Sequence, residues 1–135
     1  MRIGQVAKRA GVNVETIRFY ERKGLITQPP TNTGGYRQYP KEAIARIRFI
    51  KRAKELGFSL TEVLELLTLQ TNPQATCADV KSRAEDKIST IHGRIKDLQK
   101  MRRSLERLAA ACKGSGPLDE CPIIDCFETN KKKEE

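Results

Sequence analysis

The longest uninterrupted helical pattern in the chain lies in its C-terminal half. Residues 77–112 contain no proline and a single glycine, Gly93, and their apolar residues recur at steps of three or four positions. This spacing is typical of one face of a long helix and is close to the heptad pattern of a coiled coil. The apolar positions are Val80, Ala84, Ile88, Ile91, Ile95, Leu98, Met101, Leu105 and Leu108.

A helix of this length needs a long apolar partner to cover its stripe, and the chain offers no second helix of that size. We therefore predict a homodimer in which two such helices pair. The alternative is that the stripe folds back on residues 1–69. With four Phe, three Tyr and no Trp, a core built on aromatic rings is not expected, and the fold class is mainly α.

Two short helices are predicted at the N-terminus. Apolar residues at helical spacing favour a helix over residues 3–10, which Gly11 would end. Asn13 is a suitable N-cap for a second helix over residues 14–23, closed by Gly24. Two short helices joined by a tight turn form a helix-turn-helix candidate.

The next segment, residues 27–40, cannot be helical throughout because it contains two prolines in a row and two glycines in a row. Residues 36–39 have the composition of a short strand, so a hairpin wing beside the helix-turn-helix is expected.

Two further helices follow the expected wing. The first is predicted over residues 41–56, before Gly57. The second is predicted to begin after Ser59, which forms a capping box with Glu62, and to end near Leu69.

Positive charge is concentrated in the N-terminal half. The chain has a formal net charge of +9, and residues 1–69 carry 13 Lys and Arg against 6 Asp and Glu, whereas residues 70–135 carry 13 against 11. This excess is expected of a region that meets a polyanion, although a merely basic surface gives the same count.

The four cysteines are candidates for metal binding or redox chemistry. No apolar run reaches the roughly 20 residues of a membrane span, and the N-terminus lacks the apolar stretch of a signal peptide. We therefore expect a cytoplasmic protein without membrane contact, in which thiols stay reduced and structural disulfides are rare. The cysteines are Cys77, Cys112, Cys121 and Cys126.

Several separate segments resemble the MerR family of bacterial regulators, in order and in spacing. The resemblance implies a winged helix-turn-helix, a long antiparallel coiled-coil dimerisation helix and a C-terminal metal-binding loop with a short helix. The matching segments are Ile3-Gly4-Gln5-Val6-Ala7, the stretch from Gly11 to Leu25 containing Ile17-Arg18-Phe19-Tyr20-Glu21, Gly35-Tyr36-Arg37-Gln38-Tyr39, and the stretch from Phe49 to Leu60.

The resemblance also implies a domain organisation and a function. The expected parts are a DNA-binding domain at residues 1–69, a linker at 70–76, the dimerisation helix at 77–111, the metal-binding loop and short helix at 112–129, and a disordered tail at 130–135. Such regulators bind promoter DNA as dimers and distort it so that RNA polymerase can engage the promoter.

Five residues are expected to contact DNA in this picture. Thr16, Arg18 and Tyr20 would lie on the recognition helix, and Arg37 and Tyr39 on the wing. Phe19 is assigned to the core instead.

The cysteine spacing suits a metal site shared by two antiparallel copies. Cys77 and Cys112 are separated by about 52 Å along a helix, so one chain cannot bring them to one ion. In an antiparallel pair, Cys77 of one copy meets Cys112 of the other. Cys121 precedes a helix expected to begin at Pro122, which would lower its pKa. Three thiolates favour mercury(II) as the effector.

Other effectors stay open. Residues 121–124, Cys-Pro-Ile-Ile, resemble the mercury-responsive branch, but lead-responsive relatives look similar, and Cys77 argues against the copper(I) type. Cys126 is expected to point away; as a fourth ligand it would favour zinc(II) or cadmium(II).

Three interpretations of the sequence other than metal sensing make different demands on its residues. A thiol redox switch would need Cys112 and Cys121 but not Cys77. Burial of the cysteines as small apolar residues would leave no site at all. An enzyme is not expected, because the chain has no glycine-rich phosphate loop, no paired carboxylates and no plausible Cys/His dyad.

Overall fold

The structure, a computed structural model, describes residues 1–129. These residues contain six α-helices and one 3-10 turn, so the mainly helical class expected from the sequence is confirmed. By internal contacts the chain divides into two compact units, Met1–Arg83 and a second beginning at Ala84. The predicted tail at 130–135 lies outside the described residues.

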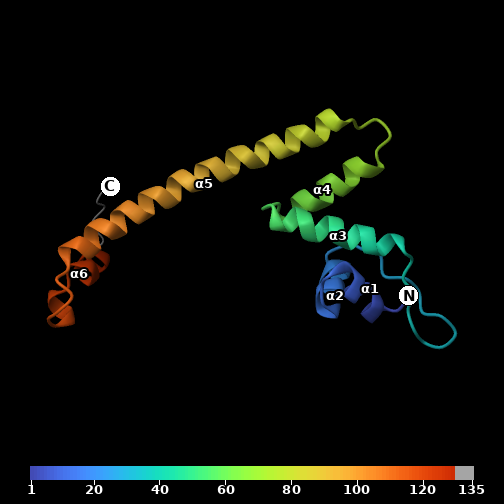
Figure 1. Cartoon of the computed structure of the whole chain (residues 1–135), viewed down its shortest axis with the longest axis horizontal. Helices are drawn as coiled ribbons and strands as arrows, with labels where there is room; N and C mark the ends of the chain where they lie inside the picture. The colour runs from blue at the N-terminus through green and yellow to red at the C-terminus, as the bar shows by residue number, and fades with distance from the viewer. Residues whose placement is uncertain (130–135) are drawn as a thin grey trace. The chain divides into compact units, whose positions relative to one another are not determined.

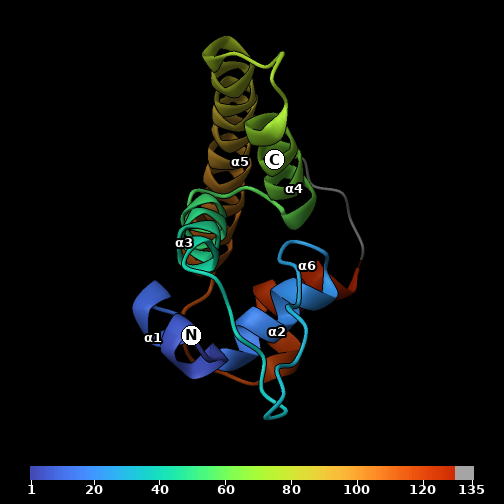
Figure 2. The ribbon, with the colours of Figure 1, turned by 90° about the vertical axis from the view of Figure 1, so that its right-hand side faces the viewer.

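The first two helices have the caps that the sequence predicts. Helix α1 (Ile3–Ala10) ends at Gly11, whose φ of 76° is the left-handed conformation that glycine adopts without strain. Helix α2 (Val14–Arg22) begins at Asn13, whose side chain accepts a hydrogen bond from the Thr16 N–H at 2.8 Å. The two helices lie side by side in both ribbon views (Figures 1 and 2).

The expected strand at residues 36–39 does not form, and the wing is a loop. Its only ladder contact among the described residues is an isolated antiparallel bridge between Thr31 and Arg37. The Asn32 side chain accepts hydrogen bonds from the N–H groups of Gly34 and Tyr36, and so closes the turn locally. Prolines on both sides of the segment donate no backbone hydrogen bond, which stops the ladder from extending.

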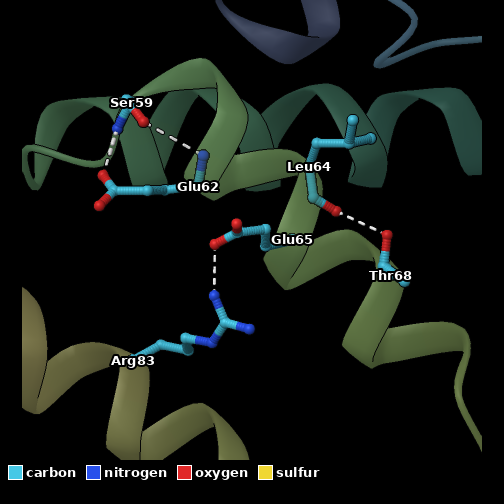
Figure 3. Close-up of polar contacts among 6 residues, drawn as sticks. All are labelled: Ser59, Glu62, Leu64, Glu65, Thr68 and Arg83. Carbon is cyan, nitrogen blue, oxygen red and sulfur yellow. Dashed lines mark hydrogen bonds and ion pairs between the residues drawn. The ribbon is translucent and has the colours of Figure 1, made fainter.

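Helices α3 (Glu42–Glu55) and α4 (Leu60–Thr71) follow the loop. The predicted capping box at the start of α4 is present, with Ser59 and Glu62 each accepting from the other's backbone N–H (Figure 3). In the middle of α4, the side chain of Glu65 forms an ion pair with Arg83 of helix α5 (Cys77–Ala111).

Basic residues of α3 hold the end of α1. Arg48 donates to the carbonyl of Arg9, and Lys51 donates to the carbonyl of Gly11, each at 2.9 Å. Cations at a helix C-terminus satisfy its last carbonyls and oppose its dipole. Part of the positive charge in this half of the chain is therefore used within the fold.

A single core joins α1, α2, α3 and α4 with the loop after α2. Each fully buried Val, Leu or Ile side chain contributes about 1.5–3 kcal/mol, so this core fixes the outward residues of α2 relative to the wing. The buried residues are Val6, Ala7, Ala10, Ile17, Tyr20, Leu25, Ile26, Tyr39, Ala43, Ile47, Ile50, Ala53, Val63 and Leu67.

Helix α5 runs from Cys77 to Ala111 without interruption, and none of its residues is buried. Its apolar stripe is open: Ile88 is 63% exposed, Leu98 60% and Leu105 57%. After α5 the chain forms the turn η1 (Leu118–Glu120) and the short helix α6 (Pro122–Glu128), which begins where the sequence predicts. Within residues 1–129, no helix has both the length and the hydropathy needed to cross a membrane.

Candidate functional site

Three arginines surround a hollow between α1, α2 and the wing. The cavity has a volume of about 310 Å³, and we call it the arginine hollow. Arg2 comes from the N-terminal segment, Arg18 from α2 and Arg37 from the wing. Clustered guanidinium groups on one surface are the usual means of binding phosphate. The other lining residues are Ile3, Glu21, Gln28, Thr31, Gly35, Tyr36 and Tyr39.

Arg18 is exposed and available to a ligand. The ion pairs found within residues 1–129 are Arg52–Glu55 and Arg83–Glu65, so neither Arg18 nor Arg37 is paired with a carboxylate in the described part of the chain. Arg37 is half-buried and donates to the Pro29 carbonyl at 2.5 Å, which fixes its guanidinium group at the rim of the hollow.

Thr16 is half-buried and takes part in the N-cap of α2. Its hydroxyl and its N–H both donate to the Asn13 side chain, at 2.8 Å each. A contact between Thr16 and DNA would therefore use the lone pairs of a hydroxyl that is already oriented.

Tyr20 and Tyr39 were expected to contact DNA, but the structure places both side chains in the core. Tyr20 is 7% exposed, and burial raises the pKa of its hydroxyl. Tyr39 is 3% exposed, and its hydroxyl donates to Glu21 at 2.5 Å. Burial, and after it the hydrogen bond and negative charge of Glu21, raise the pKa of Tyr39 to about 12, and the positive charges of Arg37 and Arg18 oppose part of this rise. Both rings therefore serve packing, although Tyr39 still lines the arginine hollow.

Phe19 was assigned to the core, and this assignment is wrong, because its side chain is 36% exposed. The cationic groups of Arg22 and Lys23 lie over its ring, 5.9 and 5.7 Å from the ring centroid. The helical spacing of α2 could have identified the buried face correctly. Ile17 and Tyr20 are three residues apart and share the inward face, while Phe19 lies on another face.

Two residues of the hollow were not anticipated. The guanidinium group of Arg2 lies 3.7 Å from the centroid of the Tyr36 ring, and Glu21 accepts from Tyr39. No local sequence pattern predicts either contact, because Arg2 and Tyr36 are 34 positions apart in the sequence and Glu21 and Tyr39 are 18 apart.

The loop after α5 holds two cysteines beside one cavity. Cys112 follows the last residue of α5 and Cys121 is the N-cap of α6. Both line a cavity of about 440 Å³, together with residues 111–118, Glu120 and Pro122. The Gly114 N–H donates to the Cys112 sulfur at 3.4 Å.

The start of α6 lowers the pKa of the Cys121 thiol. The backbone N–H groups of Ile124 and Ile123 are the largest causes that lower the pKa of Cys121. Burial opposes them, and a hydrogen bond with the Cys112 side chain adds the smallest lowering effect. The predicted direction of this shift is confirmed. The thiolate is the form that binds soft metals, so this loop favours such a ligand.

The other two cysteines do not line this cavity. Cys77 is the exposed first residue of α5, and Cys126 is half-buried on α6. Within residues 1–129 of one chain, no three Cys, His, Asp or Glu side chains gather closely enough to hold a metal ion.

An apolar groove lies near the C-terminal end of α5. Its volume is about 690 Å³, its surface is mostly apolar, and its lining includes Met101, Leu105, Leu108 and Phe127. Met101 is 53% exposed and Phe127 is 62% exposed.

Two family descriptions match most of the chain. Residues 1–70 match the MerR HTH family regulatory protein, and residues 44–108 match the description MerR, DNA binding.

Relatives extend the likeness to nearly the full length. The mercuric resistance operon regulatory protein of Bacillus cereus is 43% identical over 124 residues, which cover 92% of this chain and 94% of the relative. The HTH-type transcriptional regulator CueR of Escherichia coli is 42% identical over 125 residues, which cover 93% and 92%. The crystal structure of the transcription regulator PbrR691 from Ralstonia metallidurans, in complex with lead(II), matches with a TM-score of 0.82 at 31% identity and covers 94% of this chain and 98% of that one.

Proposed function

Because this chain belongs to the MerR family of helix-turn-helix regulators, we propose that it is a metal-responsive transcriptional regulator whose effector is mercury(II). The family is one of regulatory proteins rather than enzymes. A relative at 43% identity regulates a mercuric resistance operon, which supports the choice of ion. We place the protein in the cytoplasm, where promoter DNA and reduced thiols are both available.

The proposed DNA-binding surface is the outer face of α2 together with the arginine hollow. Arg18 and Arg37 carry positive charge that no carboxylate of the described chain neutralises, and Thr16 lies on the same helix as Arg18. Contacts to phosphate fix a protein on DNA, and a dimer that bends or twists a promoter can change its use by RNA polymerase.

The proposed assembly is a homodimer through α5. A stripe of apolar side chains that are 40–63% exposed runs along this helix from Val80 to Leu105. Two such stripes bury one another when the helices pair, and burial contributes about 25 cal/mol per Å² of apolar surface. An antiparallel pair is proposed because it brings Cys77 of a second copy to the loop that holds Cys112 and Cys121.

The observation that carries the metal proposal is the pairing of Cys112 and Cys121 beside one cavity, with the pKa of Cys121 lowered. Two thiol groups in contact, one of them biased toward thiolate, form a soft donor set suited to mercury(II). Cys77 of the second copy supplies the third sulfur.

Titration of the purified protein with mercury(II) tests this proposal. We expect an ultraviolet thiolate–metal band that saturates at about one ion per chain in the presence of a competing thiol. Cys77→Ser should abolish this retention, while Cys126→Ser, the matched control, should leave it intact. Retention that survives Cys77→Ser would contradict the three-sulfur site.

Transcription in vitro identifies the effector among the alternatives. Mercury(II) should activate the promoter at lower concentration than lead(II), cadmium(II) or zinc(II). The lead(II) complex of a regulator at 31% identity makes lead the foremost alternative. Activation by zinc(II) and not by mercury(II) would overturn the choice of ion and leave the regulator in place.

A thiol redox switch is the second candidate, because Cys112 and Cys121 are hydrogen-bonded neighbours. Oxidation would join the two sulfurs in a disulfide, with loss of two protons and two electrons to an oxidant such as a peroxide. This switch predicts that a peroxide changes transcription equally in the wild type and in Cys77→Ser, whereas metal sensing depends on Cys77.

A further inference from the structure

The arginine hollow contains a single acidic group, Glu21. A carboxylate beside Arg18 and Arg37 is unexpected on a surface proposed to bind phosphate, because it would pair with the guanidinium groups and repel DNA. No such pair forms among the described residues.

The partner of Glu21 is the Tyr39 hydroxyl, which donates to one carboxylate oxygen at 2.5 Å. Tyr39 is held firmly: its ring is in the core and its backbone N–H donates to the Met1 carbonyl at 2.6 Å. The hydroxyl therefore fixes the carboxylate on the Tyr39 side of the hollow. Arg18 and Arg37 lie close enough to act electrostatically on the same hydroxyl.

We infer that Glu21 and Tyr39 form a positioning pair in which the Tyr39 hydroxyl keeps the Glu21 carboxylate out of ion pairs with Arg18 and Arg37. Neither guanidinium group is then neutralised by a carboxylate, so the positive charge of both is left for a DNA phosphate, and the wing is tied to α2 in the same contact. The inference rests on the proposed DNA-binding function and assigns it two residues that act without touching DNA.

A pair of substitutions separates this role from simple packing. Tyr39→Phe removes the hydroxyl and keeps the buried ring, so the carboxylate is released toward the arginines. Glu21→Gln keeps an oxygen that accepts from Tyr39 and removes the negative charge. In the double variant there is no carboxylate to release. Tyr36→Phe is the matched control, since it removes a hydroxyl from the same loop but leaves the Glu21–Tyr39 contact in place.

Fluorescence anisotropy on a labelled duplex of mixed sequence, at several KCl concentrations, measures the effect. For each copy that contacts the duplex, we expect Tyr39→Phe to raise the Kd about fivefold, the size of one exposed ion pair. The slope of log Kd against log[KCl] should fall by about 0.9 per copy, the value of one phosphate contact, and so by about 1.8 for a dimer that contacts the duplex with both copies. Glu21→Gln should tighten binding, and in that background Tyr39→Phe should change the Kd by less than about 1.5-fold.

The outcomes are distinct. Circular dichroism and thermal unfolding show which variants stay folded. The effect of Tyr39→Phe on the Kd is compared between the wild-type and the Glu21→Gln background only for folded variants. If Tyr39→Phe weakens DNA binding equally in the wild-type and in the Glu21→Gln background, the hydroxyl serves only the fold, and the inference is overturned. If Tyr36→Phe shows the same background dependence, the inference also fails. A wild-type protein that binds no duplex even at low salt would instead overturn the DNA-binding function, and the inference with it.

Discussion

Cys121 owes its lowered pKa to its position at the first turn of α6. The N–H groups of Ile124 and Ile123 point toward its sulfur and stabilise the thiolate, as unpaired N–H groups at a helix start stabilise any anion. Because the folded state lowers this pKa, the thiolate's contribution to stability is present above the pKa of the unfolded chain. It is lost as the pH falls through the pKa of the folded state.

Alkylation by iodoacetamide measures this shift. In a variant that keeps Cys121 as its only cysteine, the rate should rise with pH through a midpoint below that of an ordinary thiol. The largest causes of the shift are backbone groups, so it should survive loss of the Cys112 side chain. The same variant unfolded in urea is the control, and a midpoint shared by folded and unfolded protein would refute the assignment.

Individual helices could be predicted because their signals are local. Gly11, Asn13, and the pair Ser59 and Glu62 act within one turn of their own helix, and each has the expected role. The wing depends instead on side-chain contacts that periodicity does not signal: the Asn32 side chain closes the turn, and pairing of the two arms is limited to the bridge between Thr31 and Arg37.

Removal of the capping box tests one such local signal. Ser59→Ala should lower the free energy of unfolding by about 1 kcal/mol, because the Glu62 N–H at the start of α4 loses its acceptor. Chemical denaturation followed by circular dichroism gives the value. Thr61→Ala, in the same turn and exposed, should change the stability by less than about 0.5 kcal/mol. Equal effects from the two substitutions would show that the cap adds nothing.

At the scale of the whole molecule, the proposed metal site depends on a second copy of the chain. The exposed stripe of α5 could be predicted from periodicity alone, as could the short helix after Cys121. The inward places of Tyr20 and Tyr39, and the partner of Glu21, could not, because they follow from packing between segments far apart in the sequence. The site that we propose for mercury(II) is likewise incomplete in one chain, since Cys77 and Cys112 lie at opposite ends of a helix of 35 residues.

Mixed dimers test the head-to-tail arrangement most directly. Cys77→Ser is co-expressed with a Cys112→Ser/Cys121→Ser double variant, and dimers that carry both tags are isolated. Neither homodimer should retain mercury(II) against a competing thiol. The mixed dimer should retain about one ion, because one copy supplies Cys77 and the other supplies Cys112 and Cys121. A mixed dimer that retains no mercury(II), while the wild type does, would contradict a site shared between two copies.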